Sequence, residues 1–168
     1  MSLISPEYLQ QQRLMHARGG YGVMSEKWTT SITQLAHMYG CRDILDYGCG
    51  AGKVKQAIGD IVSEYDPCIP GKDSDPEPAD MVVCTDVLEH IEPDNLDEVL
   101  KHLASKVKKI LFVTIALYKA EKRLPDGRNA HLIVESADWW REKLSKHIQF
   151  TDWSVMKHEV AGLAVLNK

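Results

Sequence analysis

The sequence contains no long run of apolar residues, and this absence excludes a membrane-spanning helix. Its first residues, Met1-Ser2-Leu3-Ile4-Ser5-Pro6-Glu7, also lack the basic and apolar regions of a secretory signal peptide. The chain has 4 cysteines, and no two of them are separated by the two-residue gap typical of zinc and redox pairs. We therefore expect a cytoplasmic protein with reduced cysteines, no structural zinc and no contact with a membrane.

Basic residues are almost missing between Ala57 and Val99, where Lys72 is the single base among 13 acids. Such a segment repels phosphate groups. Between Lys101 and Lys146 the bases outnumber the acids, which indicates either a local basic surface or ordinary solvated helix faces and loops. Internal repeats and Gly/Ser linkers are absent too, so we expect one domain over residues 1–168, for which the 44% hydrophobic content is sufficient.

From residue 43 onward, strand patterns alternate with helix patterns, in a core expected over residues 41–168. Strand patterns cover residues 43–47, 61–65, 80–85, 109–115, 148–157 and 159–166, and helix patterns cover 53–59, 93–107 and 136–147. The prolines and acids of residues 68–79 are typical of a loop. These patterns predict an α/β core with a doubly wound, Rossmann-like sheet that is mostly parallel and ends in an antiparallel hairpin.

Residues 1–40 are expected to form a helical lid in front of this core. Helix patterns cover residues 6–18 and 25–39, and Gly19-Gly20-Tyr21-Gly22 separates them. Tyr21 lies between two glycines, so it can supply an aromatic contact from a flexible lid over a cofactor. The alternative is an ordinary turn between two helices.

The glycine-rich stretch Asp46-Tyr47-Gly48-Cys49-Gly50-Ala51-Gly52 follows the first strand, where the backbone of a doubly wound sheet approaches its ligand. It does not fit the dinucleotide fingerprint, because Lys53 occupies the position of the last glycine. It does not fit a phosphate-binding P-loop either, because Val54 follows Lys53 in place of Ser or Thr.

An acid two residues before the first of three alternate glycines resembles motif I of the class I S-adenosylmethionine-dependent methyltransferases, and the resemblance covers about residues 40–166. The resemblance implies that S-adenosylmethionine is the cofactor and that motif I and the end of the second strand bind it, through Asp46, Gly48, Cys49, Gly50, Gly52 and Asp66. Asp66 stands where the family binds the ribose hydroxyls, and a carboxylate can accept a hydrogen bond from both. Its alternative role is that of a turn-forming residue before Pro67.

The chain departs from the family between Asp66 and Asp80, where the segment is too short for the usual third edge strand. We therefore expect the strand that ends at Asp66 to lie at the edge of the sheet. The acid that contacts adenine in the family normally follows the missing strand. Asp73 or Asp75 in the loop can take its place.

The stretch Asp86-Val87-Leu88-Glu89-His90 follows the third strand, so Asp86 and Val87 are expected beside the cofactor. If residues 86–90 form a helical turn, Asp86, Glu89 and His90 share one face and can bind a divalent metal ion. The stretch resembles the acid-x-x-Glu-His element of ubiquinone-biosynthesis O-methyltransferases and of small-RNA 3′-terminal 2′-O-methyltransferases, where a later histidine completes a metal site; His131 matches that histidine.

Mixed carboxylate and imidazole ligands suit Mn²⁺, Fe²⁺, Co²⁺ or Zn²⁺ better than Mg²⁺. Without a metal, His90 or His131 is a candidate catalytic base, and Glu89 can be a surface residue. His131 lies in a loop over residues 116–133 that is long for a compact domain, which favours a functional role. Trp139 and Trp140 follow that loop and line either an acceptor pocket or the core.

The acceptor is expected to be an oxygen atom, because the stretch after the third strand lacks the prolines of base-amine methyltransferases and Cys84 lacks the Pro-Cys context of a cytosine nucleophile. A small molecule is favoured, since no extra domain is available for a larger substrate. The alternatives are a ribose 2′-hydroxyl at an RNA end, with phosphate contacts from Lys119, Lys122, Arg123 and Arg128, and a non-catalytic S-adenosylmethionine-binding protein.

Overall fold

The computed structural model describes residues 3–19, 21–22 and 24–166. Its central sheet has the strand order β2-β1-β3-β4-β6-β5. The strands are β1 (Ile44–Tyr47), β2 (Val62–Tyr65), β3 (Ala79–Thr85), β4 (Val107–Ala116), β5 (Asp152–Val155) and β6 (Glu159–Val165). The helices are α1 (Pro6–Ala17), α2 (Thr29–Met38), α3 (Lys53–Ile58), α4 (Leu96–Ser105) and α5 (Ala137–Ser145), with 3₁₀ turns at Met24–Trp28, Leu88–His90 and Pro93–Asn95.

The sheet is mixed in the way that the sequence predicts. Strands β1 to β4 pair in parallel, β6 runs antiparallel to β4, and β5 runs antiparallel to β6. Strand β2 lies at one edge, because residues 66–78, all of them described, form a loop without a strand. The doubly wound α/β fold, the missing edge strand and the C-terminal hairpin are therefore confirmed.

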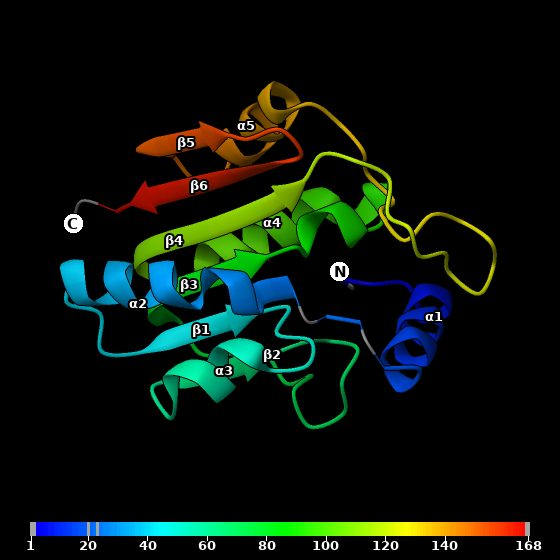
Figure 1. The fold of residues 1–168 in the computed structure, drawn as a ribbon, viewed down its shortest axis with the longest axis horizontal. Coiled ribbons are helices and arrows are strands. Elements are labelled where there is room, and N and C mark those ends of the chain that lie inside the picture. The colour runs from blue at the N-terminus through cyan, green and yellow to red at the C-terminus, as the bar shows by residue number, and fades with distance from the viewer. Residues whose placement is uncertain (1–2, 20, 23, 167–168) are drawn as a thin grey trace.

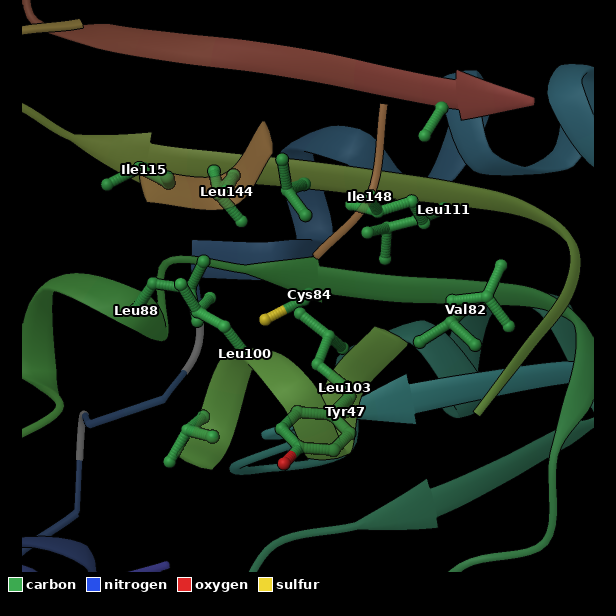
Figure 2. Close-up of a cluster of buried hydrophobic side chains, with 14 of the residues drawn as sticks. Tyr47, Val82, Cys84, Leu88, Leu100, Leu103, Leu111, Ile115, Leu144 and Ile148 are labelled. Carbon is green, nitrogen blue, oxygen red and sulfur yellow. The ribbon is translucent and has the colours of Figure 1, made fainter. Parts of the chain in front are cut away.

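Two hydrophobic clusters cover the two faces of the sheet. Successive strand residues point to opposite faces, so Val82 packs with Leu103 of α4 on one face, while Met81 packs with Ile32 of α2 on the other. Figure 2 shows the first cluster, in which Cys84 and Leu103 lie among the apolar side chains between the sheet and α4. Because helices cover both faces, every residue of β3 is buried.

Some predicted boundaries were wrong. Strand β4 begins at Val107, two residues before its predicted start, and β5 covers only part of the predicted 148–157. The helix predicted over 25–39 is divided into a 3₁₀ turn and α2, and at their junction the Thr29 hydroxyl donates a hydrogen bond to the Glu26 carbonyl. Gly40 has a φ of 57° and follows the end of α2, as predicted.

Helix α1 lies on the side toward which β1, β3 and β4 point (Figure 1). The Ser5 hydroxyl and backbone amide donate hydrogen bonds to the Glu92 carboxylate, and the Tyr8 hydroxyl donates one to the His90 carbonyl. The N-terminal segment is thereby fixed above the carboxyl ends of the strands. Within the described ranges, no helix is long and apolar enough to cross a membrane.

The packing of β4 can be tested by removing one buried side chain. Leu111 is fully buried in the middle of β4, so Leu111→Ala should lower the free energy of unfolding by about 3 kcal/mol. Leu14 on α1 is 45% exposed, so Leu14→Ala should change it by less than about 0.5 kcal/mol. Urea denaturation of the two variants measures both values, and equal effects would contradict the observed core.

Candidate active site

The glycine turn after β1 has a backbone that side chains would disrupt. Gly48, Gly50 and Gly52 have φ values of 78°, 49° and 72°. A Cβ atom on Gly48 would lie 2.5 Å from a methyl carbon of Val87. The glycines therefore let the turn take a left-handed course and pack closely against the residue that follows β3.

The N-terminal segment lies directly against this turn. The Ala51 amide donates a 3.0 Å hydrogen bond to the Gly22 carbonyl, and a Cβ atom on Gly50 would lie 2.7 Å from the Gly22 oxygen. Gly22 and Gly50 thus allow two backbones to touch. The predicted lid contacts the predicted cofactor turn, although Gly20, part of the predicted hinge, lies outside the described residues.

Asp46 is 1% exposed at the end of β1, and its Oδ2 atom has no hydrogen-bond partner among the described residues. Burial raises the pKa of its carboxyl to about 7, and the neighbouring acids Glu64 and Asp66 add to the effect, while Lys72 opposes it. The turn therefore holds a carboxyl group that titrates close to neutral pH.

Asp66 connects the end of β2 to the glycine turn. Its Oδ2 accepts a 3.1 Å hydrogen bond from the Gly50 amide, and its Oδ1 accepts a 2.9 Å bond from the Cys68 amide. The second bond is the turn-forming role that was the alternative to ribose binding. Asp66 also lines the cavity described next, so its position is compatible with both roles.

A cavity of about 520 Å³ opens at the carboxyl ends of the strands, between the sheet, α1 and the loop after β4. The predicted site residues that line it are Tyr21, Gly48, Gly50, Asp66, Asp86, Val87, His90 and His131. The predicted residues Asp46, Cys49, Gly52 and Glu89 are buried next to these residues. The structure thus brings the two predicted groups, the glycine turn and the acid-x-x-Glu-His element, to one cavity.

Glu89, His90 and His131 form a compact group of side chains. Each offers one possible metal-ligand atom, and these atoms lie within 4.8 Å of one another. The Nδ1 atom of His90 is 2.7 Å from the Ala130 carbonyl, and Nδ1 of His131 is 2.5 Å from the Tyr118 carbonyl. Because a carbonyl oxygen can only accept, both Nδ1 atoms donate, and each neutral ring keeps its lone pair on Nε2.

Burial raises the pKa of Glu89 and lowers the pKa of His90, so it disfavours the charged form of both. Glu89 is fully buried, so the pKa of its carboxyl rises to about 8, an effect that Asp86 increases. Its Oε1 accepts a 2.8 Å hydrogen bond from the Ala116 amide, while Oε2 is unpartnered within the described part of the chain. Burial lowers the pKa of His90 to about 3, and His131 adds to that effect, so His90 is neutral at physiological pH.

The sequence suggested that Asp86 shares a helical turn with Glu89 and His90. In the structure it does not. It has a φ of 54°, and only Leu88–His90 form a 3₁₀ turn, so its side chain lies outside the compact group of three. It still lines the cavity, and burial raises the pKa of its carboxyl, while Lys27 opposes that effect. A left-handed Asp is uncommon, and here it directs the chain from β3 into the turn.

The tryptophan pair Trp139-Trp140 and the loop acid Asp75 were further candidates for the site. Trp140 is completely buried and belongs to the core, whereas Trp139 lines a second cavity of about 570 Å³ between α4, α5 and the loop after β4. His131 lines both cavities. Asp75 accepts hydrogen bonds from His102 and Lys106, which connects its loop to α4.

Several tyrosines in the cavity were missed. Tyr47 and Tyr65 precede Gly48 and Asp66 directly and line the cavity beside them. Their position at the ends of strands was the signal that could have identified them. Tyr8 and Tyr118 come from α1 and from the loop after β4, and no local pattern places these segments at the cavity.

The buried Asp46 carboxyl predicts a pH effect on stability. Its folded pKa of about 7 lies above its unfolded value near 4, so its contribution to stability is complete below about pH 4 and is lost as the pH rises through 7. Asp46→Asn removes this loss, so the variant should gain stability over the native protein between pH 5 and pH 8, reaching on the order of 2 kcal/mol.

Urea denaturation at four pH values measures this gain in the absence of ligand. The control is Asp94→Asn, which changes an exposed acid and should leave the pH profile unchanged. Parallel profiles for Asp46→Asn and the native protein would contradict the shifted pKa.

Comparisons with known proteins agree with this geometry. No curated protein matches the chain. A methyltransferase from Clostridium acetobutylicum ATCC 824, described as S-adenosylmethionine-dependent, is 13% identical with a TM-score of 0.65, and the match covers 95% of this chain and 97% of that one. The 1,6-didemethyltoxoflavin-N1-methyltransferase of Burkholderia thailandensis, solved with 1,6-didemethyltoxoflavin and S-adenosylhomocysteine, is 17% identical with a TM-score of 0.64 over 100% of this chain and 93% of that one.

The magnesium protoporphyrin IX methyltransferase of Synechocystis PCC 6803, solved with bound S-adenosylhomocysteine, is 17% identical with a TM-score of 0.62 over 96% of this chain and 97% of that one. At these identities the likeness shows the fold. A family model described as "Methyltransferase domain" matches residues 14–163, which is most of the chain. With its sheet, its glycine turn and this match, the chain belongs to the methyltransferase domain family and is an enzyme of the methyltransferase class.

Proposed function

We propose that the chain binds S-adenosylmethionine at the glycine turn and transfers its methyl group to an oxygen atom of a small molecule. The observation that carries the proposal is the turn itself, in which Gly48 and Gly50 expose backbone to a cavity flanked by the acid Asp66. When bound, S-adenosylmethionine supplies a methyl group on a positively charged sulfur. The solved structures with S-adenosylhomocysteine in the same fold support this ligand.

The charges of the turn suit this cofactor better than a nucleotide phosphate. Asp46, Glu64 and Asp66 lie close enough to affect one another, and Lys72 pairs with Glu64 at 3.0 Å. A carboxylate accepts hydrogen bonds from ribose hydroxyls and attracts a cationic ligand, but repels a phosphate. Asp66, held by the two backbone amides, is the residue that we assign to the ribose.

We further propose that Glu89, His90 and His131 hold a divalent metal ion. Three features fit such an ion: the compact geometry, the buried Oε2 atom of Glu89 without a described partner, and the two histidines whose Nδ1 atoms are fixed by carbonyls. A hydrogen bond from the second ring nitrogen to a carbonyl is the usual support for a metal-bound histidine. The mixed ligand set favours Mn²⁺, Fe²⁺, Co²⁺ or Zn²⁺ over Mg²⁺.

The chemistry expected of this group is activation of the acceptor oxygen. A neutral alcohol is a weak nucleophile, and a bound divalent ion lowers the pKa of an oxygen that it holds. His90 and His131 place imidazole rings at the cavity wall, so either is a candidate base for the acceptor proton if no metal is present. Both histidines line the same cavity as Val87 and the glycine turn, which supports this role.

The structure favours a small acceptor over an RNA end. Of the four basic loop residues that were candidates for phosphate contacts, Arg128 pairs with Asp126, and Arg123 donates a hydrogen bond to the Gly127 carbonyl. Lys122 lies over the ring of Tyr21, and Lys119 lines the second cavity. Arg123 and Arg128 therefore have partners within the loop itself, which leaves fewer bases for phosphate contacts.

Binding of the cofactor can be tested at Gly48. Gly48→Ala places a methyl group against Val87 in a left-handed turn, so it should weaken S-adenosylhomocysteine binding at least about tenfold in isothermal titration calorimetry. The matched control is Gly127→Ala, because Gly127 also has a positive φ, of 90°, but no heavy atom lies within 4 Å of its added Cβ among the described residues. Native protein that binds neither S-adenosylmethionine nor S-adenosylhomocysteine would refute the proposal.

Metal binding can be tested independently of activity. Protein stripped with a chelator should bind Mn²⁺ or Zn²⁺ with one site in calorimetry, and Glu89→Gln or His131→Ala should weaken that binding by about 10- to 100-fold. The matched control, His37→Ala, changes an exposed histidine on α2 and should bind like the native protein. Equal binding by all four proteins, or full methyl transfer in the presence of a chelator, would exclude the metal.

The same assays separate an enzyme from a non-catalytic binding protein. An enzyme converts S-adenosylmethionine to S-adenosylhomocysteine in a broad screen of hydroxylated acceptors, and its activity depends on His131. A binding protein shows a cofactor-dependent rise in melting temperature without turnover in any acceptor mixture. The family match favours the first outcome.

A further inference from the structure

A continuous series of aromatic and imidazole rings lines the cavity. In spatial order the six residues are His16, Tyr21, His90, His131, Tyr118 and His158. The distances between successive ring centroids are 5.0, 5.6, 4.7, 5.5 and 5.9 Å, and every pair meets edge to face. These residues come from α1, the loop after it, the 3₁₀ turn Leu88–His90, the loop after β4 and the turn before β6, so the series joins five segments into one wall of the cavity.

The inner and outer parts of this wall differ. Tyr21 and His90 are partly buried near the glycine turn, and the Tyr21 hydroxyl is 3.1 Å from His90 Nδ1. Tyr118 is 45% exposed, and His158 is exposed as well. Both side chains line the cavity, so their rings are accessible to a ligand there.

The charges around the outer rings disfavour an anion. Asp86 and Glu159 line the cavity there, and Lys27, which lines it as well, pairs with Glu159 at 2.6 Å. Lys122, the other lysine among the described lining residues, lies over the Tyr21 ring in the inner part of the wall. An added carboxylate or phosphate would meet Asp86, which is only partly exposed, so repulsion between the like charges is screened less than in bulk water. An uncharged ring avoids this cost and can contact the faces or edges of Tyr118 and His158.

We propose that the methyl acceptor is a neutral, planar aromatic alcohol, and that Tyr118 and His158 bind its ring. This inference rests on the proposed function, since the acceptor oxygen must lie near His131 and the glycine turn at the same time. The ring series continues from His131 to Tyr118 and His158, so an acceptor that extends outward from His131 contacts these two side chains. The wall therefore selects for flat, aromatic substrates.

Three probes of the same carbon skeleton separate ring contact from charge. They are 2-naphthol, its saturated counterpart decahydro-2-naphthol, and the anionic 6-hydroxy-2-naphthoate. Each is titrated calorimetrically into native protein saturated with S-adenosylhomocysteine. We expect 2-naphthol to bind at least about fivefold more tightly than either of the others, as edge-to-face ring contacts and the absence of charge repulsion require.

Variants then locate the contact. Tyr118→Leu and His158→Leu should each weaken 2-naphthol binding about fivefold and leave decahydro-2-naphthol binding unchanged. Tyr118→Phe keeps the ring and should bind 2-naphthol like the native protein. His37→Leu on α2 is the matched control for a histidine replaced outside the cavity and should have no effect.

The outcomes are distinguishable. Preference for the saturated or the anionic probe, or no binding of any probe to the S-adenosylhomocysteine complex, overturns the proposal. A preference for 2-naphthol that survives both leucine substitutions overturns the roles of Tyr118 and His158. If S-adenosylhomocysteine itself does not bind, the proposed function fails first, and melting curves of the exposed-site variants show whether they are folded.

Discussion

The arrangement of the site depends on the buried side chain of Glu89. Its carboxylate accepts a hydrogen bond from the amide of Ala116 at the end of β4, and its backbone carbonyl accepts one from the amide of Ile133. One residue therefore joins the turn after β3, the end of β4 and the far end of the long loop. Because burying a carboxyl group is costly, these bonds hold the three segments in one arrangement, which brings His131 against His90.

The glycine turn could be predicted from the sequence because its requirements are local. Positive φ values at Gly48, Gly50 and Gly52 and an acid at the strand end depend on residues within one stretch of chain. The alternating strands and helices were predictable for the same reason, since buried periodicity is local. The missing edge strand followed from the prolines between Asp66 and Asp80, which leave no length for it.

The remaining features depend on contacts between distant residues. The turn at Asp86 was predicted as helical, but its left-handed backbone follows from the way β3 and β4 pair, since the Asp86 amide donates to the Thr114 carbonyl. Likewise, Tyr8 reaches the cavity through a hydrogen bond to the carbonyl of His90, 82 positions away. The sequence of α1 has little apolar periodicity, and it carries no local signal that Tyr8, Gln12 and Met15 are buried.

The acidic half of the sequence has a structural consequence at the site. Asp46, Glu64 and Asp66 come from the ends of β1 and β2, which pair side by side, so their charges add where the glycine turn faces the cavity. Burial raises the pKa of Asp46, and this local excess of acids adds to the effect. It also makes the turn a poor site for a phosphate, although the glycines alone would suit one. A cationic ligand lowers the repulsion among these acids when it binds. The acids that repel one another around the turn thus favour a positively charged ligand there. The sequence encodes that preference through the near absence of bases from Ala57 to Val99.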